Sequence, residues 1–149
     1  MVKKIGKVEG VIYSLPLEIA MNVFQKGRSV FVKYTPHEPT KKTENRLDKN
    51  MKLFIYISKS NKSVIGEATI KEISYLDLEE MLRKYKNKIM ISEAELYLYA
   101  EGRERKRAQV LELKNIVLYP REIPVKVPVT MGGVYVTKEN KKNVFGKTK

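Results

Sequence analysis

Hydrophobic positions near the start of the chain follow two different spacings, which predict a strand, a helix and a second strand. Val8–Tyr13 is a short, mostly apolar run that favours a strand. Pro16 suits the first turn of a helix, and the apolar residues after it share one helix face: Leu17, Ala20, Met21 and Phe24. Gly27 is placed to end that helix, and Ser29–Tyr34, rich in β-branched and aromatic residues, predicts the next strand.

The middle of the chain predicts a β-hairpin that follows a long polar loop. Thr35–Asn50 carries two prolines and many charges, and a loop of this length inside a compact domain is often functional or disordered. Lys52–Ser58 is apolar without clean alternation, which indicates a central strand covered on both faces. A turn at 60–62 leads into the strand Ser63–Ile73, where we expect one face to hold Val64, Gly66, Ala68 and Ile70.

Two helix-capping patterns mark further helices in the second half of the chain. Ser74, with Asp77 three residues later, predicts a helix whose apolar face is formed by Leu78, Met81, Leu82 and Tyr85. Ser92–Glu95 is a capping box, in which each side chain bonds to the other residue's backbone N–H. It predicts a third helix that runs to about Ala100.

The C-terminal part predicts two more strands and a tail. After a charged turn at 101–107, Val110–Tyr119 favours a long strand, bulged near Asn115. Three prolines between residues 120 and 128 predict extended, irregular chain. A Gly-Gly turn precedes a last short strand, Val134–Thr137, and we expect the lysine-rich tail at 138–149 to be frayed.

Length and composition fit one α+β domain at residues 1–137, with a basic arm at 1–7 and the tail at 138–149. The absence of cysteine excludes disulfides, thiolate metal sites and cysteine nucleophiles, and the single histidine excludes a histidine-rich metal site. We therefore expect no cofactor. No apolar run is long enough to span a bilayer and no secretory signal pattern is present, so we expect a cytoplasmic protein without a membrane partner.

A formal net charge of +13, from 30 basic and 17 acidic residues, would attract phosphate polymers. The two ends, 1–7 and 138–149, together hold eight lysines and one glutamate, so the body of the chain is only modestly basic. A charged share of 32% with two glutamines and neither cysteine nor tryptophan also suits a hyperthermophile. The charge is thus either a dedicated binding surface or a property of the composition.

Two residues are candidates for catalysis. His37, in the polar loop, titrates near neutrality and is either a general base or a solvated loop histidine. Glu67 stands among the small and apolar residues of 65–68. Its carboxylate either faces a pocket, where desolvation raises its pKa, or points outward and pairs with a lysine such as Lys71.

Two basic clusters are candidates for contact with nucleic acid. Arginine forks onto phosphate, lysine offers a point charge and tyrosine offers a stacking face. The first cluster ends the first helix and the strand after it, and comprises Lys26, Arg28, Lys33, Tyr34 and Thr35, extended along the loop by Lys41, Lys42, Arg46 and Lys49. The second comprises Arg103, Arg105, Lys106 and Arg107, diluted by two glutamates. The alternative for both is a solvated charged loop.

The order of these features resembles the PUA-like superfamily, which includes PUA, ASCH and EVE domains. The features are a helix ended by Gly27 and a basic residue, a strand ending in Lys33-Tyr34, a long loop, an apolar strand and the sequence Val64-Ile65-Gly66-Glu67-Ala68. The resemblance covers residues 8–137, is most telling between 15 and 73, and is closest to an uncharacterised archaeal family. It implies a small mixed β-barrel with about three helices outside. It also implies a cleft for RNA, a nucleotide or a modified base, lined by the strand after the first helix.

The ASCH strand pattern is matched only in part. Gly27-Arg28 fits its Gly-Lys start, but its glutamate position falls on Phe31 and Lys33 replaces its arginine, which argues against an ASCH-type hydrolytic activity.

Three functions follow from the sequence. We favour a non-catalytic RNA-binding module, in which Lys33 faces the cleft and Tyr34 reaches it from the rim. The alternatives are an enzyme acting on a nucleotide or RNA through Glu67, His37 or Lys33, and a reader of a modified base or small nucleotide. The reader would need aromatic walls, for which Tyr34 and Tyr135 are the candidates.

Overall fold

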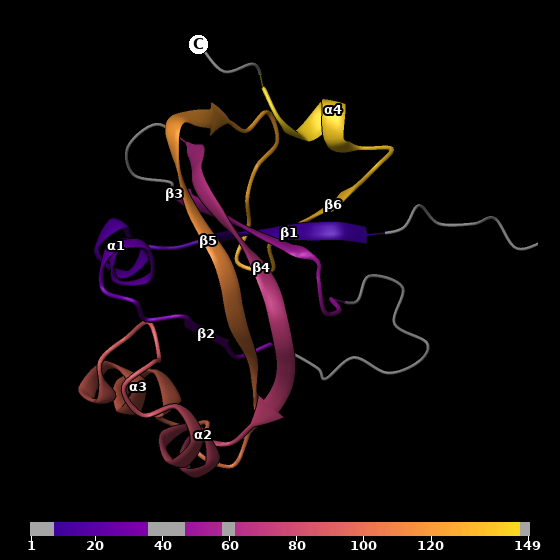
Figure 1. The fold of residues 1–149 in the computed structure, drawn as a ribbon. Helices are drawn as coiled ribbons and strands as arrows, with labels where there is room; N and C mark the ends of the chain where they lie inside the picture. Colours follow the sequence, from indigo (N-terminus) through magenta and orange to yellow (C-terminus); the bar gives the residue numbers. More distant parts are fainter. Residues whose placement is uncertain (1–7, 36–46, 58–61, 147–149) are drawn as a thin grey trace, which may run out of the picture.

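The computed structural model describes residues 8–35, 47–57 and 62–146, which form one six-stranded sheet flanked by helices (Figure 1). The elements are β1 (Val8–Ser14), α1 (Leu17–Gln25), β2 (Val30–Lys33), β3 (Lys52–Ile57), β4 (Ser63–Leu76), α2 (Leu78–Tyr85), α3 (Glu93–Ala100), β5 (Ala108–Pro124), β6 (Val134–Thr137) and α4 (Lys141–Val144). The strand order is β2-β5-β4-β3-β1-β6, in which only β1 and β3 are parallel neighbours. The predicted α+β class with a mixed sheet is confirmed.

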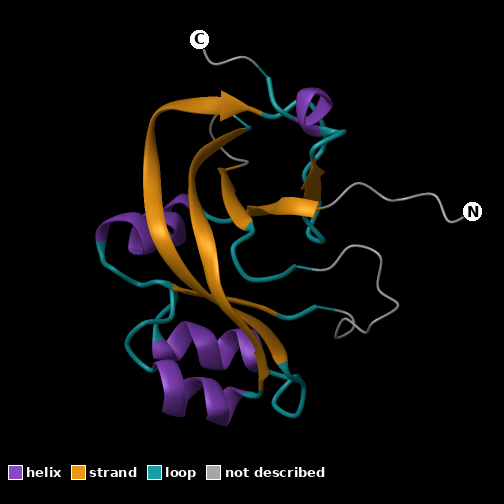
Figure 2. Cartoon of the chain, turned by 45° about the vertical axis from the view of Figure 1, so that its right-hand side comes forward, coloured by secondary structure: helices purple, strands orange, loops and turns teal. Residues whose placement is uncertain are grey.

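The sheet curls strongly, but no strand ladder within the described ranges closes it into a barrel. The two long strands β4 and β5 sweep along the molecule and bend on the way (Figures 1 and 2). The edges are β2 and β6, each four residues long, so each has few backbone groups for a closing ladder. Side chains join β1 to β2 instead, because the rings of Tyr13 and Phe31 stack with centroids 5.2 Å apart. Closure of the expected barrel is therefore not observed among the described residues, whose strands form an open, curled sheet.

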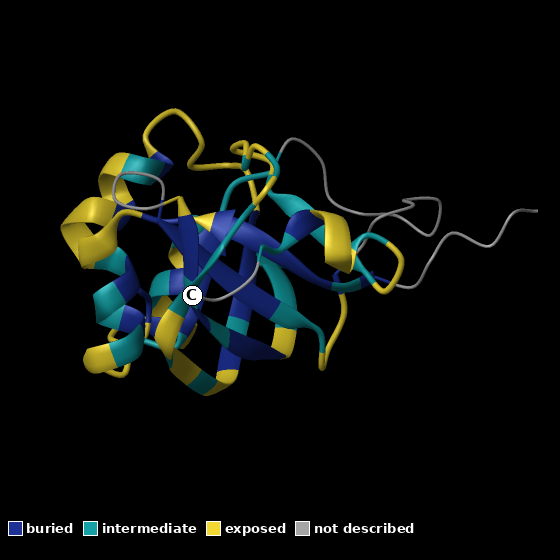
Figure 3. Cartoon of the chain, turned by 90° about the horizontal axis from the view of Figure 1, so that it is seen from above, coloured by how far each residue is buried: buried dark blue, intermediate teal, exposed yellow. Residues whose placement is uncertain are grey.

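Two hydrophobic clusters lie on opposite faces of the central strand β3, as its continuous apolar sequence predicts. Leu53, Ile55 and Ile57 pack in the larger cluster, which we call the inner core, with residues of α1, β2, α2 and α3. Phe54 and Tyr56 point the other way into a smaller cluster beneath β6 and α4, which we call the outer core. Buried residues accordingly occupy the crossing strands, while the outward faces of the helices are exposed (Figure 3).

Bulges move several strand residues away from their predicted face. The ladder between β4 and β5 shifts register at three places, including one near Asn115, which has φ of 50°. The bulge predicted there is confirmed. Val64, however, packs in the outer core, whereas Ala68 and Ile70 pack in the inner core, so the single face predicted for them is wrong. A bulge reverses the alternation of side chains, and the sequence pattern does not show where it occurs.

The helices begin and end close to their predicted positions, with two corrections. In α1, Ala20 and Val23 are buried while Leu17 is 53% exposed, so the buried face is rotated from the predicted one. In α2 the capping residue is Asp77, whose carboxylate accepts from the backbone N–H of Glu80, so Ser74 stays within β4. Glu80 returns the bond to the Asp77 backbone, and this reciprocal box outcompetes the single serine cap.

The C-terminal region is more ordered than its prolines and lysines predict. β5 continues to Pro124, past Pro120, because prolines are tolerated along a strand edge that donates no ladder bond. Residues 141–144 form the single-turn helix α4, with Val144 buried and the Phe145 ring edge-on to Phe54. The expectation of a frayed tail is therefore wrong for 138–146. None of the helices in the described chain is long and apolar enough to cross a membrane.

Candidate nucleic-acid interface

A cleft of about 290 Å³ opens where the end of β1, the start of α1 and the end of β2 meet α3. Its walls are mainly apolar, from residues such as Leu15, Ile19 and Met131. The polar groups that reach it are few: Lys33, Glu95, Tyr99 and the hydroxyls of Ser14 and Thr130. A mostly apolar hollow with a few convergent polar groups is the usual form of a ligand site.

Lys33, the last residue of β2, supplies the positive charge of this cleft. Its Nζ lies 5.1 Å from the centroid of the Tyr13 ring, over the same ring on which Phe31 stacks. Burial lowers the pKa of Lys33, since desolvation disfavours the ammonium form. None of the described carboxylates forms an ion pair with this ammonium. Lys33 therefore presents a partly desolvated cation that has no anionic partner among the described residues.

A buried chain of hydrogen bonds lies beneath Lys33 and holds Tyr13 in place. The Tyr13 hydroxyl donates to Oε1 of Gln109 at 3.2 Å, and Nε2 of Gln109 lies 3.4 Å from the Tyr75 hydroxyl. The cross-strand register aligns these groups, because Gln109 of β5 lies opposite both Lys33 of β2 and Tyr75 of β4. Burial and the neighbouring Tyr135 hydroxyl raise the pKa of Tyr13 far above its ordinary range. The ring beneath the Lys33 ammonium is therefore neutral and is held by hydrogen bonds.

Tyr34, Tyr99 and Arg103 form one rim beside the cleft. The Tyr34 and Tyr99 rings meet edge to face at 5.0 Å, and the Arg103 guanidinium carbon lies 5.6 Å and 5.7 Å from their centroids. Arg103 Nη1 also donates to the Tyr99 carbonyl at 2.8 Å, and the Tyr34 backbone N–H donates to the Tyr99 hydroxyl at 2.9 Å. The fold therefore joins one residue from each of the two basic clusters.

The remaining predicted contact residues lie around this centre at different distances. Lys26 is exposed at the end of α1, and Nη1 of Arg28 donates to the Ile89 carbonyl at 3.0 Å. Both residues precede the start of β2, whereas Lys33 is at its end. Thr35 follows the rim, and Arg105 and Arg107 are exposed on the charged turn after α3. Tyr135 does not line the cleft. It packs against the inner core, and its hydroxyl is hydrogen-bonded to that of Tyr13.

Glu67 lies on the other face of the sheet from Lys33. Its carboxylate forms an ion pair with Lys52 at 2.8 Å and accepts a hydrogen bond from the Tyr119 hydroxyl at 2.8 Å. Burial opposes ionisation, but these hydrogen bonds from Lys52 and Tyr119 outweigh it and lower the pKa of Glu67. Tyr119 packs against the outer core, whereas Lys33 stands over Tyr13 in the inner core. The two side chains do not converge on one pocket. His37 lies outside the described residues, as do Lys41, Lys42 and Arg46.

Sequence patterns alone did not mark Tyr13, Gln109 or Tyr99 as residues of the site. Gln109 is one of two glutamines in the chain and directly precedes an apolar strand run, which is the one signal that marked it. Tyr13 and Tyr99 appear in the sequence as ordinary strand and helix aromatics.

Comparison with known proteins identifies relatives of this fold. The model of a domain of unknown function, DUF365, matches residues 8–138. An uncharacterised protein of Methanocaldococcus jannaschii is 30% identical over 107 residues, which are 65% of this chain and 99% of that protein. The crystal structure of ASCH from Zymomonas mobilis superposes with a TM-score of 0.73 at 20% identity, covering 90% of this chain and 92% of that one. A serine-to-alanine mutant of the same protein gives 0.67 at 19% identity, covering 93% and 96%. This likeness confirms the predicted similarity of the fold to that of ASCH.

Proposed function

The chain belongs to the DUF365 family and has an ASCH-like fold, and we propose that it is an RNA-binding module whose contact centre is the cleft at Lys33. The observation that carries the proposal is the ammonium of Lys33, which is partly desolvated above the Tyr13 ring and has no ion-pair partner among the described residues. Partial desolvation of a cation costs free energy, and a ligand that supplies an anion offsets this cost. The phosphates of RNA are such anions, and the formal net charge of +13 attracts them to the protein.

The rim supplies the second kind of contact that a single strand needs. Bases stack on aromatic side chains and on guanidinium planes, and each base stacked in this way contributes about 1–3 kcal/mol. Tyr99 lines the cleft and Arg103 covers both rim tyrosines. One nucleotide therefore has a cation for its phosphate at Lys33 and a stacking surface at Arg103.

A reader of a single nucleotide or modified base is the second candidate, and the size of the cleft favours it. A volume of about 290 Å³ is at the lower end of the range for small-molecule pockets. The nucleotide reader would use the same cleft as the RNA-binding module and would differ from it only in the ligand that is bound. Mass spectrometry of the purified protein would show a co-purified nucleotide, whereas the RNA-binding module would release only oligonucleotides or none.

The test of the proposal compares two arginines of the same charged turn. Arg103→Ala removes the guanidinium over the rim, while Arg105→Ala removes the same charge from an exposed position without a ring contact. Binding to a fluorescent single-stranded RNA is measured by anisotropy over a salt series. We expect Arg103→Ala to weaken binding by about 1–2 kcal/mol and Arg105→Ala by about half a kcal/mol or less. Equal losses would mean diffuse attraction by charge, and no binding at low salt would exclude the module altogether.

A further inference from the structure

Two stretches of chain without any acidic residue lie side by side at the start of β2. Residues 19–35 and 81–92 together hold seven basic side chains and neither Asp nor Glu. The second stretch ends α2 and leads to α3, and its basic side chains are all exposed: Arg83, Lys84, Lys86 and Lys88. We call residues 83–88 the lysine turn.

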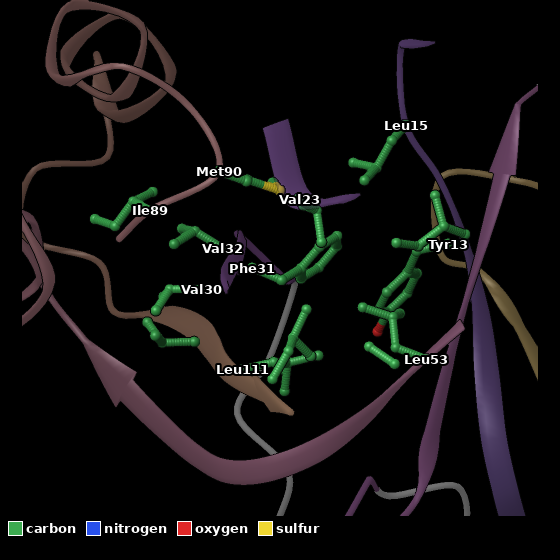
Figure 4. Close-up of a cluster of buried hydrophobic side chains, with 14 of the residues drawn as sticks. Tyr13, Leu15, Val23, Val30, Phe31, Val32, Leu53, Ile89, Met90 and Leu111 are labelled. Carbon is green, nitrogen blue, oxygen red and sulfur yellow. The ribbon is translucent and has the colours of Figure 1, made fainter. Parts of the chain in front are cut away.

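Backbone hydrogen bonds fasten the end of the lysine turn to β2. The Val30 N–H donates to the Lys88 carbonyl at 3.0 Å, and the Met90 N–H donates to the Val30 carbonyl at 2.9 Å. Arg28 adds its bond to the Ile89 carbonyl, and Ile89 and Met90 belong to the same buried cluster as Val30 (Figure 4). Because the backbone is already held, the lysines need little further ordering of the main chain to meet a ligand.

The charges of this surface are not neutralised by the rest of the described chain. Among the described residues, ion pairs join Lys49, Lys52 and Lys141 to glutamates, and none includes Lys26, Lys86 or Lys88. Glu95, a carboxylate that lines the cleft, accepts from the Ser92 backbone N–H in the capping box of α3 and keeps its negative charge. Lys26, Lys86 and Lys88 are therefore exposed cations that have no ion-pair partner among the described residues.

The patch is continuous with the cleft. Hydrogen bonds with Ser92, together with the nearby positive charge of Arg28, lower the pKa of Glu95, a residue that lines the cleft. From Arg28 to Lys33 the chain runs along β2, a span of about 16 Å at roughly 3.3 Å per residue. A stacked strand of nucleic acid, rising about 3.4 Å per nucleotide, covers that span in about five steps.

We propose that the lysine turn, with Lys26 and Arg28, forms a second phosphate-binding surface that holds the flanking part of an RNA strand engaged in the cleft. This inference rests on the proposed function and adds the direction and length of the bound strand. The strand runs from the rim at Arg103, past Lys33, to Lys86 and Lys88. An RNA shorter than the distance from Lys33 to Arg28 contacts the cleft and not the lysine turn.

The experiment uses RNA length to separate the two surfaces. Anisotropy is measured with three-nucleotide and ten-nucleotide oligouridylates for the wild type, Lys86→Ala/Lys88→Ala and a control, Lys126→Ala/Lys142→Ala. The control removes the same charge beside α4, at the other end of the molecule (Figure 1). We expect the lysine-turn variant to bind the ten-nucleotide RNA about tenfold more weakly, with a salt slope lower by about 1.4. Its affinity for the three-nucleotide RNA and its melting temperature stay unchanged.

Two results would overturn the inference. One is an equal loss in the control variant, and the other is an unchanged affinity for the ten-nucleotide RNA. If the lysine-turn variant instead loses binding to phosphatidylserine vesicles and not to RNA, the patch serves a membrane and the inference is wrong. Failure of the proposed function is a separate outcome, because the wild type would then bind neither RNA at low salt.

Discussion

Replacing Lys33 by methionine separates a residue that binds a ligand from one that supports the fold. Methionine keeps most of the apolar stem and removes the ammonium. In the free protein this ammonium has one visible compensation, the face of the Tyr13 ring at 5.1 Å, and such a contact is worth about 0.5–1 kcal/mol where solvent is near. Burial acts against the charge, which the lowered pKa of Lys33 shows. The two effects nearly cancel, so the free energy of unfolding should change by less than about 1 kcal/mol.

The pH dependence of stability indicates the sign of this small change in the free energy of unfolding. Because the pKa of Lys33 is lower in the folded state than its ordinary value of 10.5, the buried charge destabilises the protein below the folded-state pKa. The penalty disappears as pH rises through that pKa toward 10.5. Any gain in stability from Lys33→Met at pH 7 should therefore shrink by pH 10, as urea unfolding at the two pH values would show.

Binding should respond far more strongly than stability. A hydrogen bond to a charged group contributes about 1.5–3 kcal/mol, so Lys33→Met should raise the dissociation constant for RNA by roughly 10- to 150-fold. The loss of one phosphate contact should also lower the salt slope by about 0.7. Anisotropy titrations at several salt concentrations measure both quantities. An unchanged affinity, or a loss of more than about 2 kcal/mol of stability, would refute the interpretation of Lys33 as a ligand contact.

Two further predictions concern the sheet that supports the site. Gly66→Ala should cost about 2–3 kcal/mol in thermal unfolding, because its Cβ would overlap the Phe24 ring and lie 2.5 Å from the Val117 carbonyl oxygen. Gly132→Ala, where the nearest atom is 3.8 Å away, is the matched control and should change little. Glu67→Gln should flatten acid denaturation, since the lowered pKa of Glu67 gives the wild type stability above about pH 4.5 that is lost as pH falls through the folded-state pKa. Urea unfolding at pH 7 and pH 3 tests this, and equal acid sensitivity of both proteins would contradict it.

Local patterns predicted most of the elements, because the signals that define them lie within a few residues. The box of Ser92 and Glu95 is present as predicted, with both bonds near 3 Å. The continuous apolar sequence of β3 gave its central position. The register of β4 against β5 could not be predicted in this way, because three shifts redistribute its side chains between the two cores.

The set of residues that form the site also could not be predicted from the sequence, because it depends on contacts between segments that are distant along the chain. Tyr34 and Arg103 stand in different basic clusters, and only the packing of α3 against β2 brings them together. Lys33 and Gln109 are aligned by a ladder between strands 76 positions apart. The face of Glu67 was left open in the sequence, and its pairing with Lys52 supports the structural alternative.

The position of Lys33 could also be explained by a general property of edge strands, and the structure distinguishes this explanation from ligand binding. Edge strands commonly carry lysines that discourage pairing with other chains, and β2 is an edge strand. A lysine with that role keeps its ammonium in water, where the charge costs nothing and repels a second strand. Lys33 instead lies over Tyr13 on the inner-core side of the sheet, and burial lowers its pKa. Protection of the edge would not require that desolvation, whereas an anion entering the cleft would benefit from it, because charge interactions strengthen where water is excluded. The position of the ammonium therefore favours ligand binding over edge protection.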